Sequence, residues 1–155
     1  GRFEDVTSRC GEAACRPRVS RGAAFGDIDN DGDVDVIVVE ARGGPEVLRN
    51  DGGNENAWCL IELTGSGLNL DAIGARVSVT ASGHTQIAER RSSGSYLSAN
   101  DPRLHFGLGN AKRIDCIEVR WPEGRTEAYM ELPVRRLLKI TSGKRDVAAV
   151  DLKMR

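Results

Sequence analysis

The sequence predicts an all-β protein in which short strands form a sandwich or a barrel. Short runs of alternating apolar and polar residues recur along the chain, and clusters of Gly, Asn, Asp and Pro separate them. In one such run Val77, Val79 and Ala81 are apolar whereas Ser78 and Thr80 are polar, as in a sheet with one solvated face. No long amphipathic helical pattern occurs, and 18 glycines fit a turn-rich β protein.

The expected strands follow one another with a turn signal after almost every one. The segment Pro122-Glu123-Gly124 is a typical hairpin turn, because proline fixes φ at its first corner. A short apolar strand precedes the acidic segment described below. The complete set of expected strands is 22–26, 34–39, 45–49, 57–64, 74–81, 84–91, 103–108, 114–121, 125–131 and 136–141, with a weaker one at 147–152.

The acidic segment at residues 27–35 holds five aspartates within nine positions. Like charges at contact distance disfavour ionisation, so an ordered loop of this kind needs protons, basic partners or a cation. The spacing favours Ca²⁺, which prefers six to eight oxygen ligands, and Gly32 at loop position 6 permits a sharp turn. The expected ligands are the side chains of Asp27, Asp29, Asp31 and Asp35 and the backbone carbonyl of Asp33.

This loop differs from an EF-hand at one decisive position. An EF-hand requires a bidentate Glu at position 12 and a helix on either side, but position 12 here is Val38. The β-branched run 34–39 that follows the acidic loop favours a strand. The sequence therefore predicts a calcium loop between two strands.

The acidic loop and the motifs after it resemble two known families. Residues 25–35 (FGDIDNDGDVD) are similar to an FG-GAP or VCBS-type calcium repeat, the blade unit of integrin-like β-propellers. Five downstream motifs follow the order seen in the ASPIC/UnbV domain of cartilage acidic protein-like secreted proteins: NAW at 56–58, IGARV at 73–77, SYLS at 95–98, LHFGLG at 104–109 and VRWPEG at 119–124.

The resemblance implies an all-β fold, made of a single propeller-blade-like calcium hairpin and an antiparallel β-sandwich. The expected division is a hairpin segment at 1–52, a sandwich at 53–144 and a C-terminal strand or tail at 145–155. One blade cannot bury both of its faces without neighbours. The chain could therefore be the C-terminal part of a propeller protein, dock its hairpin on its own sandwich, or complete the hairpin with a neighbouring subunit.

The net charge and the lengths of the apolar runs limit the kinds of partner to expect. A formal net charge of −1 gives no reason to expect nucleic acid or an anionic membrane surface, and no apolar run approaches the ~20 residues that cross a bilayer. The chain begins at Gly1 without a signal peptide, so we expect a processed mature chain or a clipped fragment. The expected partners are an extracellular protein or glycan, or further copies of the chain.

Four cysteines allow three disulfide pairings, and the sequence does not choose among them. Cys10 and Cys15 bracket a polar, turn-rich segment and could form a local disulfide. Alternation places Cys59 on a core face and Cys116 away from one, which disfavours a bridge between those two. A calcium loop together with a disulfide indicates a secreted, extracellular location.

No arrangement of a nucleophile and a base is visible, so no catalytic residue is expected. Trp58 and Trp121 are expected in core or interface packing, and Tyr96 beside a Ser/Gly-rich stretch is the best candidate for ligand contact. The sequence thus predicts a secreted, calcium-binding, non-catalytic adhesion or interaction module. The alternative is a self-assembling subunit of an extracellular filament or surface layer, whose open hairpin edge is completed by a neighbour.

Overall fold

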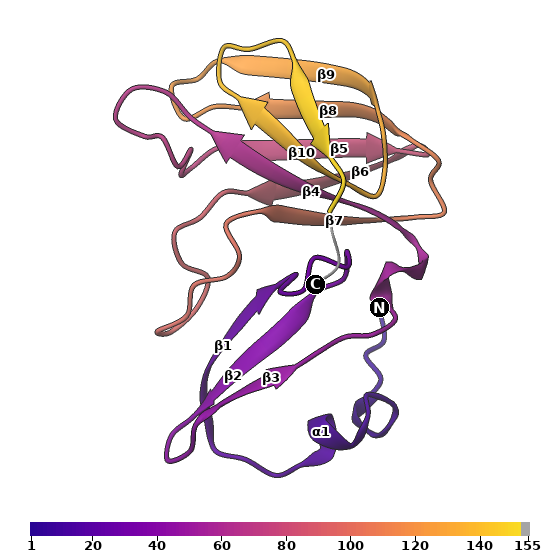
Figure 1. The fold of residues 1–155 in the computed structure, drawn as a ribbon, viewed down its shortest axis with the longest axis vertical. Helices are drawn as coiled ribbons and strands as arrows, with labels where there is room; N and C mark the ends of the chain where they lie inside the picture. Colours follow the sequence, from indigo (N-terminus) through magenta and orange to yellow (C-terminus); the bar gives the residue numbers. More distant parts are fainter. Residues whose placement is uncertain (153–155) are drawn as a thin grey trace.

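The structure, a computed structural model, describes residues 1–152 and contains three β-sheets (Figure 1). Short helical turns are η1 (Thr7–Arg9), α1 (Glu12–Cys15) and η2 (Gly53–Glu55). The strands are β1 (Ser20–Gly26), β2 (Asp35–Glu40), β3 (Pro45–Leu48), β4 (Ala57–Thr64), β5 (Arg76–Ala81), β6 (His84–Glu89), β7 (Leu104–Gly109), β8 (Ile114–Arg120), β9 (Thr126–Leu132), β10 (Arg136–Thr141) and β11 (Val147–Val150).

The first sheet is small, antiparallel and ordered β1-β2-β3, so it extends the predicted strand–loop–strand hairpin by one strand. It forms the lower part of the molecule in Figure 1. The N-terminal segment is tied to it by Arg18, whose guanidinium lies 2.8 Å from Glu46 and 3.8 Å from Glu40. A further bond from Arg18 to the Ala13 carbonyl holds α1 in place.

The other two sheets pack face to face as a sandwich and confirm the predicted all-β class (Figure 1). Their strand orders are β11-β10-β4-β7 and β6-β5-β8-β9. The hairpin turn predicted at Pro122-Glu123-Gly124 joins β8 to β9, and Gly124 adopts a φ of 93° there. The Trp121 amide donates to the Arg125 carbonyl at 2.8 Å and closes this turn.

One strand pair departs from the expected antiparallel sandwich. β4 pairs in parallel with β10, from Cys59 opposite Arg136 to Thr64 opposite Thr141. β4 is buried on both faces, with Cys59 and Ile61 facing the sandwich core and Trp58 and Leu60 facing away from it. A near-continuous apolar run is typical of such a strand.

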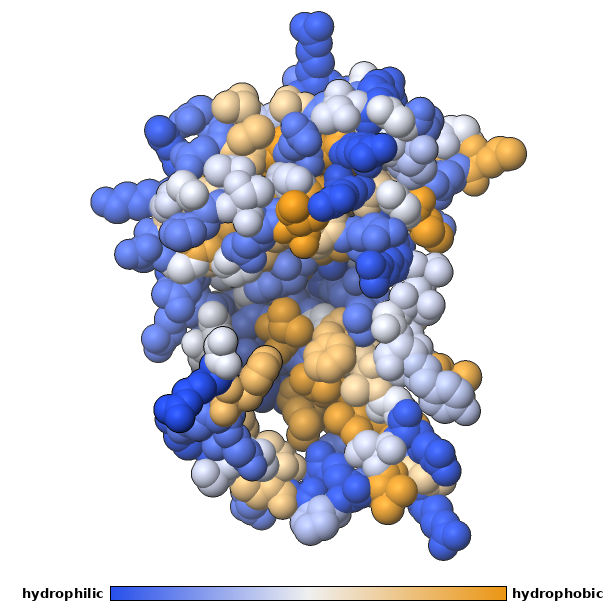
Figure 2. Space-filling model, turned by 180° about the vertical axis from the view of Figure 1, so that it is seen from behind, coloured by the Kyte–Doolittle hydropathy of each residue, from blue (hydrophilic) through white to orange (hydrophobic). Residues whose placement is uncertain are grey.

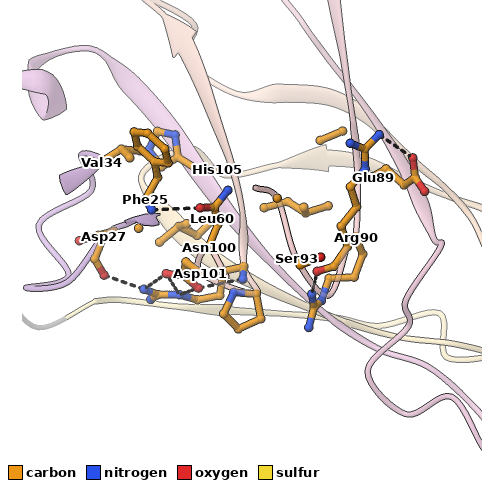
Figure 3. A pocket seen from close by; sticks show the side chains of 17 residues that line it. Phe25, Asp27, Val34, Leu60, Glu89, Arg90, Ser93, Asn100, Asp101 and His105 are labelled. Atoms are coloured by element: carbon orange, nitrogen blue, oxygen red, sulfur yellow. Dashed lines mark hydrogen bonds and ion pairs between the residues drawn. The ribbon is translucent and has the colours of Figure 1, made fainter. Parts of the chain in front are cut away.

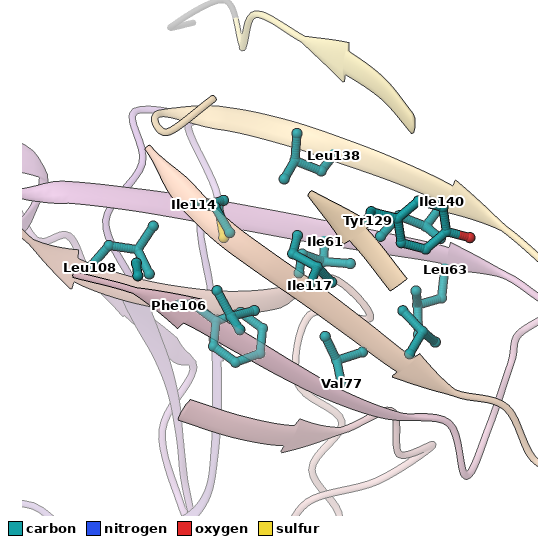
Figure 4. Close-up of a cluster of buried hydrophobic side chains, with 14 of the residues drawn as sticks. Ile61, Leu63, Val77, Phe106, Leu108, Ile114, Ile117, Tyr129, Leu138 and Ile140 are labelled. Atoms are coloured by element: carbon teal, nitrogen blue, oxygen red, sulfur yellow. The ribbon is translucent and has the colours of Figure 1, made fainter. Parts of the chain in front are cut away.

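The core lies between the two sandwich sheets (Figure 4). Ile61, Val77, Ile117 and Leu138 are fully buried in it, and Trp121 is 1% exposed. The apolar face predicted for the strand with Val77 and the packing predicted for Trp121 are therefore confirmed. A second, smaller cluster on the outer face of β4 contains Trp58, Leu60 and Leu137.

The cysteines correct one prediction. All four thiols are free in the structure, so the disulfide expected between Cys10 and Cys15 is not formed there. Instead their Sγ atoms lie 3.4 Å from the Val6 carbonyl and 3.5 Å from the Thr7 carbonyl, because the helical turns offer local acceptors. Cys59 is fully buried in the core as predicted, and burial raises the pKa of its thiol to about 12.

The β1–β3 sheet leaves several large hydrophobic side chains in contact with solvent. Viewed from behind, hydrophobic residues gather over the lower part of the molecule, where this sheet lies (Figure 2). Phe25, Val39 and Val47 are exposed on its strands, and Val19 and Ile28 are exposed just before and just after β1. Within residues 1–152, no helix combines the length and the apolar character needed to cross a membrane.

Candidate metal centre

Three carboxylates of the acidic loop meet at one point. Oxygen atoms of Asp27, Asp29 and Asp35 lie within 4.8 Å of one another. Asp27 directly follows β1, and Asp35 is the first residue of β2, so pairing of the two strands brings the ends of the loop together. This is the strand–loop–strand arrangement predicted from the sequence.

Backbone amides hold two of these carboxylates in place. Asp27 accepts hydrogen bonds from the amides of Asp31 and Gly32, each at 3.1 Å. Asp35 accepts one from Ile28 at 3.0 Å and one from Asn50 at 2.9 Å. Hydrogen bonds from backbone amides therefore fix the side chains of the first and last aspartates of the loop.

The other two aspartates of the predicted ligand set lie outside the group of three. Asp31 turns toward the loop backbone, where its Oδ1 accepts a hydrogen bond from the Asp33 amide at 3.0 Å. Asp33 is 2% exposed, and its Oδ2 accepts from the Gly53 amide at 2.9 Å. The Asp33 side chain thus connects the loop to η2.

Two buried carboxylate oxygens in this loop have no hydrogen-bond partner among the described residues, Oδ1 of Asp29 and Oδ1 of Asp33. An unsatisfied buried acceptor costs about 1–3 kcal/mol, and more when it is charged. Carboxylate oxygens are the ligands that a hard cation such as Ca²⁺ takes. The donor set and the unsatisfied oxygens therefore fit calcium, with Asp27, Asp29 and Asp35 as the side chains nearest to holding it.

Burial raises the pKa of both Asp27 and Asp33 above the ordinary value of 3.8. In metal-free protein the folded chain therefore binds protons more tightly than the unfolded chain does. Stability contributed by these groups is then present below about pH 3.8 and is lost as pH rises through their raised pKa values. A cation at the loop would oppose this loss, because it stabilises the ionised form.

We therefore expect Asp33→Asn to stabilise the metal-free protein near pH 7, because the amide is uncharged and can still accept from Gly53. The advantage should shrink as pH falls from 7 through the raised pKa of Asp33, because the Asp33 carboxylate itself then becomes protonated. Melting temperatures of both proteins in excess chelator, measured across this pH range, check the trend. A difference between the two that stays constant with pH would contradict it.

The acidic loop is also attached to the sandwich by one arginine. Arg103, just before β7, donates through Nη2 to the Asp27 carbonyl at 2.7 Å and through Nη1 to Asn30 Oδ1 at 2.8 Å. The same guanidinium pairs with Asp101 at 2.5 Å, and both side chains are less than one fifth exposed. Arg103 thus spans the hairpin and the sandwich.

Two aromatic side chains of the sandwich complete this attachment. His105 of β7 forms a 2.9 Å hydrogen bond between its Nε2 and the Gly32 carbonyl. Trp58 of β4 stacks on His105 with ring centroids 6.4 Å apart, and its indole lies directly against Gly32. The loop therefore packs on the apolar outer face of β4 at Trp58.

The segment between β6 and β7 packs along β1 (Figure 1). The Asp101 amide donates to the Phe25 carbonyl at 2.8 Å, and the Phe25 amide donates to Asn100 Oδ1 at 3.1 Å. Of the three arrangements considered for a single blade, the structure shows docking on the chain's own sandwich. The sheet face carrying Val39 and Val47 remains exposed.

Sequence reasoning found the aspartates but missed the residues that dock them. Arg103, His105 and Asn100 lie more than 70 positions from their partners, and no local pattern marks such a contact. Trp58 had a usable signal, because it and Leu60 make β4 apolar on both faces. Tyr96, the candidate ligand contact, is 68% exposed in the turn at 95–98.

Comparison with known families gives one match. The model of the family described as ASPIC and UnbV matches residues 65–147, which is more than half of the chain. This segment covers most of the sandwich, and the acidic loop lies before it. A search of curated proteins finds no match.

Proposed function

The chain belongs to the ASPIC and UnbV family, and on that premise we propose that it is an extracellular, calcium-binding interaction module without catalytic activity. Domains of this family occur in extracellular proteins, which supports the location. In this proposal Ca²⁺ binds the acidic loop, rigidifies the hairpin and holds it on the sandwich. The partner is an extracellular protein or a glycan.

One observation carries the calcium assignment: three converging carboxylates lie in a loop where two buried carboxylate oxygens have no hydrogen-bond partner within residues 1–152. Such a loop is strained by charge and desolvation when it is empty. A divalent cation relieves both costs at once. Because Arg103 and His105 bond to the loop, a loop stabilised by calcium also stabilises the packing of the hairpin on the sandwich.

The expected stabilisation follows from linkage. A ligand that binds only the folded chain adds RT ln(1 + [Ca²⁺]/Kd), which is about 2.7 kcal/mol at 100-fold saturation. Extracellular calcium modules commonly have a Kd of about 10⁻⁴–10⁻³ M, in the range of millimolar calcium. A gain of this size is a large part of a typical domain stability of about 5–15 kcal/mol.

The structural roles of the polar residues support the absence of catalysis. His105 is engaged with the Gly32 carbonyl, so this imidazole, a side chain suited to acid–base work near neutral pH, already holds the hairpin. His84 is exposed at the start of β6. This leaves binding, rather than a reaction, as the role that the acidic loop can serve.

Self-assembly is a second candidate, favoured by the exposed Val39 and Val47 and by β3 lying at a sheet edge. An edge strand can pair with another chain. Size-exclusion chromatography with calcium separates the candidates, since discrete monomers agree with an interaction module and polymers with assembly.

Asp29→Asn is the sharpest test of calcium binding, because the Asp29 side chain forms no hydrogen bond among the described residues. The variant should lose most of the calcium-dependent rise in melting temperature. In excess EGTA it should be as stable as the unsubstituted protein or more stable, because one half-buried carboxylate charge is removed from the acidic loop. Melting curves with about 2 mM calcium and with EGTA measure both effects.

Asp71→Asn is the matched control, since Asp71 is an exposed aspartate outside the loop. It should keep the full calcium response. Terbium provides an independent readout, because the indole of Trp58 lies against the loop and can sensitise its emission. Identical melting curves with calcium and with EGTA, together with no sensitised emission, would contradict the proposal.

A further inference from the structure

A cleft of about 420 Å³ lies at the seam between the hairpin and the sandwich (Figure 3). Phe25 and Asn100 lie on one side of it, and Arg90 and Ser93 lie on the other. The volume falls within the range of small-molecule sites, about 300–1,000 Å³. The metal centre described above touches this cleft only through Asp27.

Arg90 is the one arginine in the lining of this cleft that, among residues 1–152, has no carboxylate within ion-pair distance. Nη1 of its guanidinium donates to the Arg91 carbonyl. The other two arginines of the cleft are paired, Arg103 with Asp101 and Arg91 with Glu89. Arg90 is only partly exposed, so water compensates its charge incompletely.

The backbone of Arg90 is fixed although it lies beyond the end of β6. Its amide donates to the Ala75 carbonyl and its carbonyl accepts from the Gly74 amide, each at 2.8 Å. The opposite wall is fixed too, because Phe25 is bonded through its amide and carbonyl to Asn100 and Asp101. A ligand would therefore meet a preformed site, which reduces the entropic cost of binding.

The rest of the lining contains both apolar surface and hydrogen-bonding groups. Phe25, Pro102 and Leu104 offer apolar surface, whereas Ser93 and Asn100 offer a hydroxyl and an amide. A pyranose ring has the same mixture, with C–H faces that pack on apolar groups and hydroxyls that need donors and acceptors. A carboxylate on that ring would supply the partner that Arg90 lacks.

We propose that this cleft binds an acidic saccharide unit, with the ring between Phe25 and Ser93 and its carboxylate on the Arg90 guanidinium. The proposal rests on the role as an interaction module and names its ligand class and site. An acidic peptide is the competing ligand. It fits less well, because Phe25, one of the two β1 residues that border the cleft, is already bonded to residues 100–101 and offers no free strand edge.

The test is a titration of the ¹⁵N-labelled chain with D-glucuronate, followed by NMR. We expect saturable shifts at Phe25 and Ser93 with a Kd in the millimolar range, as suits so small a ligand. D-glucose, which lacks the carboxylate, should bind at least tenfold more weakly. Arg90→Gln should weaken glucuronate binding at least tenfold, and Arg42→Gln, at an exposed arginine outside the cleft, should leave it unchanged.

Equal glucuronate binding by Arg90→Gln and by the unsubstituted chain would overturn the proposal. So would saturable shifts with triglutamate but none with glucuronate. The melting temperature of each variant, with calcium and with EGTA, is measured on the same samples. A normal rise in melting temperature with calcium but no glucuronate binding would refute only the proposed saccharide site. Glucuronate binding without any rise in melting temperature with calcium would refute only the proposed role of calcium.

Discussion

Gly32→Ala, which adds a single methyl group to the acidic loop, is expected to lower the free energy of unfolding by about 2–5 kcal/mol. Two costs add at this position. Gly32 has a φ of 101°, in the left-handed region that a side chain disfavours. An added Cβ would also overlap the indole ring of Trp58, which projects from the outer face of β4 against the loop.

Chemical denaturation of Gly32→Ala measures the loss, and two variants separate its causes. Gly67 also has a positive φ but has open space where an added methyl group would lie, so Gly67→Ala isolates the backbone cost. Trp58→Ala combined with Gly32→Ala should show a strongly favourable coupling, since the overlap is then gone. If Gly32→Ala cost no more than Gly67→Ala, the close contact with Trp58 would be refuted.

Arg103→Ala is expected to cost about 2–4 kcal/mol and to loosen the hairpin specifically. It would leave Asp101, whose side chain is 16% exposed, as a largely buried carboxylate without its cation. The Asp27 carbonyl and Asn30 would lose their donors at the same time. Hydrogen exchange should therefore accelerate in β1 and β2 more than in β5 and β8.

Arg113→Ala provides the comparison, because Arg113 also forms ion pairs, with Asp115 and Glu131, but its side chain is 64% exposed. An exposed ion pair contributes little, so a loss below about 1 kcal/mol is expected. Arg103→Lys should not restore stability fully, since one ammonium cannot reproduce the planar fork that reaches three partners. Uniform exchange across both parts of the molecule in Arg103→Ala would argue against a specific attachment.

Most strands were predictable because they are short and bounded by turn residues, and several also alternate between apolar and polar positions. The alternation at Val77 and Val79 in β5 predicts a strand from neighbouring residues alone, and Pro122-Glu123-Gly124 predicts a turn in the same way. The parallel pairing of β4 with β10 was not predictable in the same way. It depends on which of several apolar strands meet in space, and the only local hint was the apolar outer face of β4 at Trp58 and Leu60.

The acidic loop shows the same division between local and distant information. Repulsion among closely spaced aspartates is a local property, so the sequence alone located the candidate centre. The structure then brought together three of the five, Asp27, Asp29 and Asp35, because strand pairing sets which carboxylates face one another. Arg103 could not be identified beforehand, since nothing near it distinguishes it from other arginines of the chain.

The parallel pairing of β4 with β10 also bears on how quickly the chain folds. Partners in this pair, such as Glu62 and Lys139, are 77 positions apart, so a long loop must close before they meet. Proteins dominated by such distant contacts fold slowly, on the scale of milliseconds to seconds. The outer face of β4 at Trp58 would stay uncovered during that interval, a period in which intermolecular association competes with correct closure.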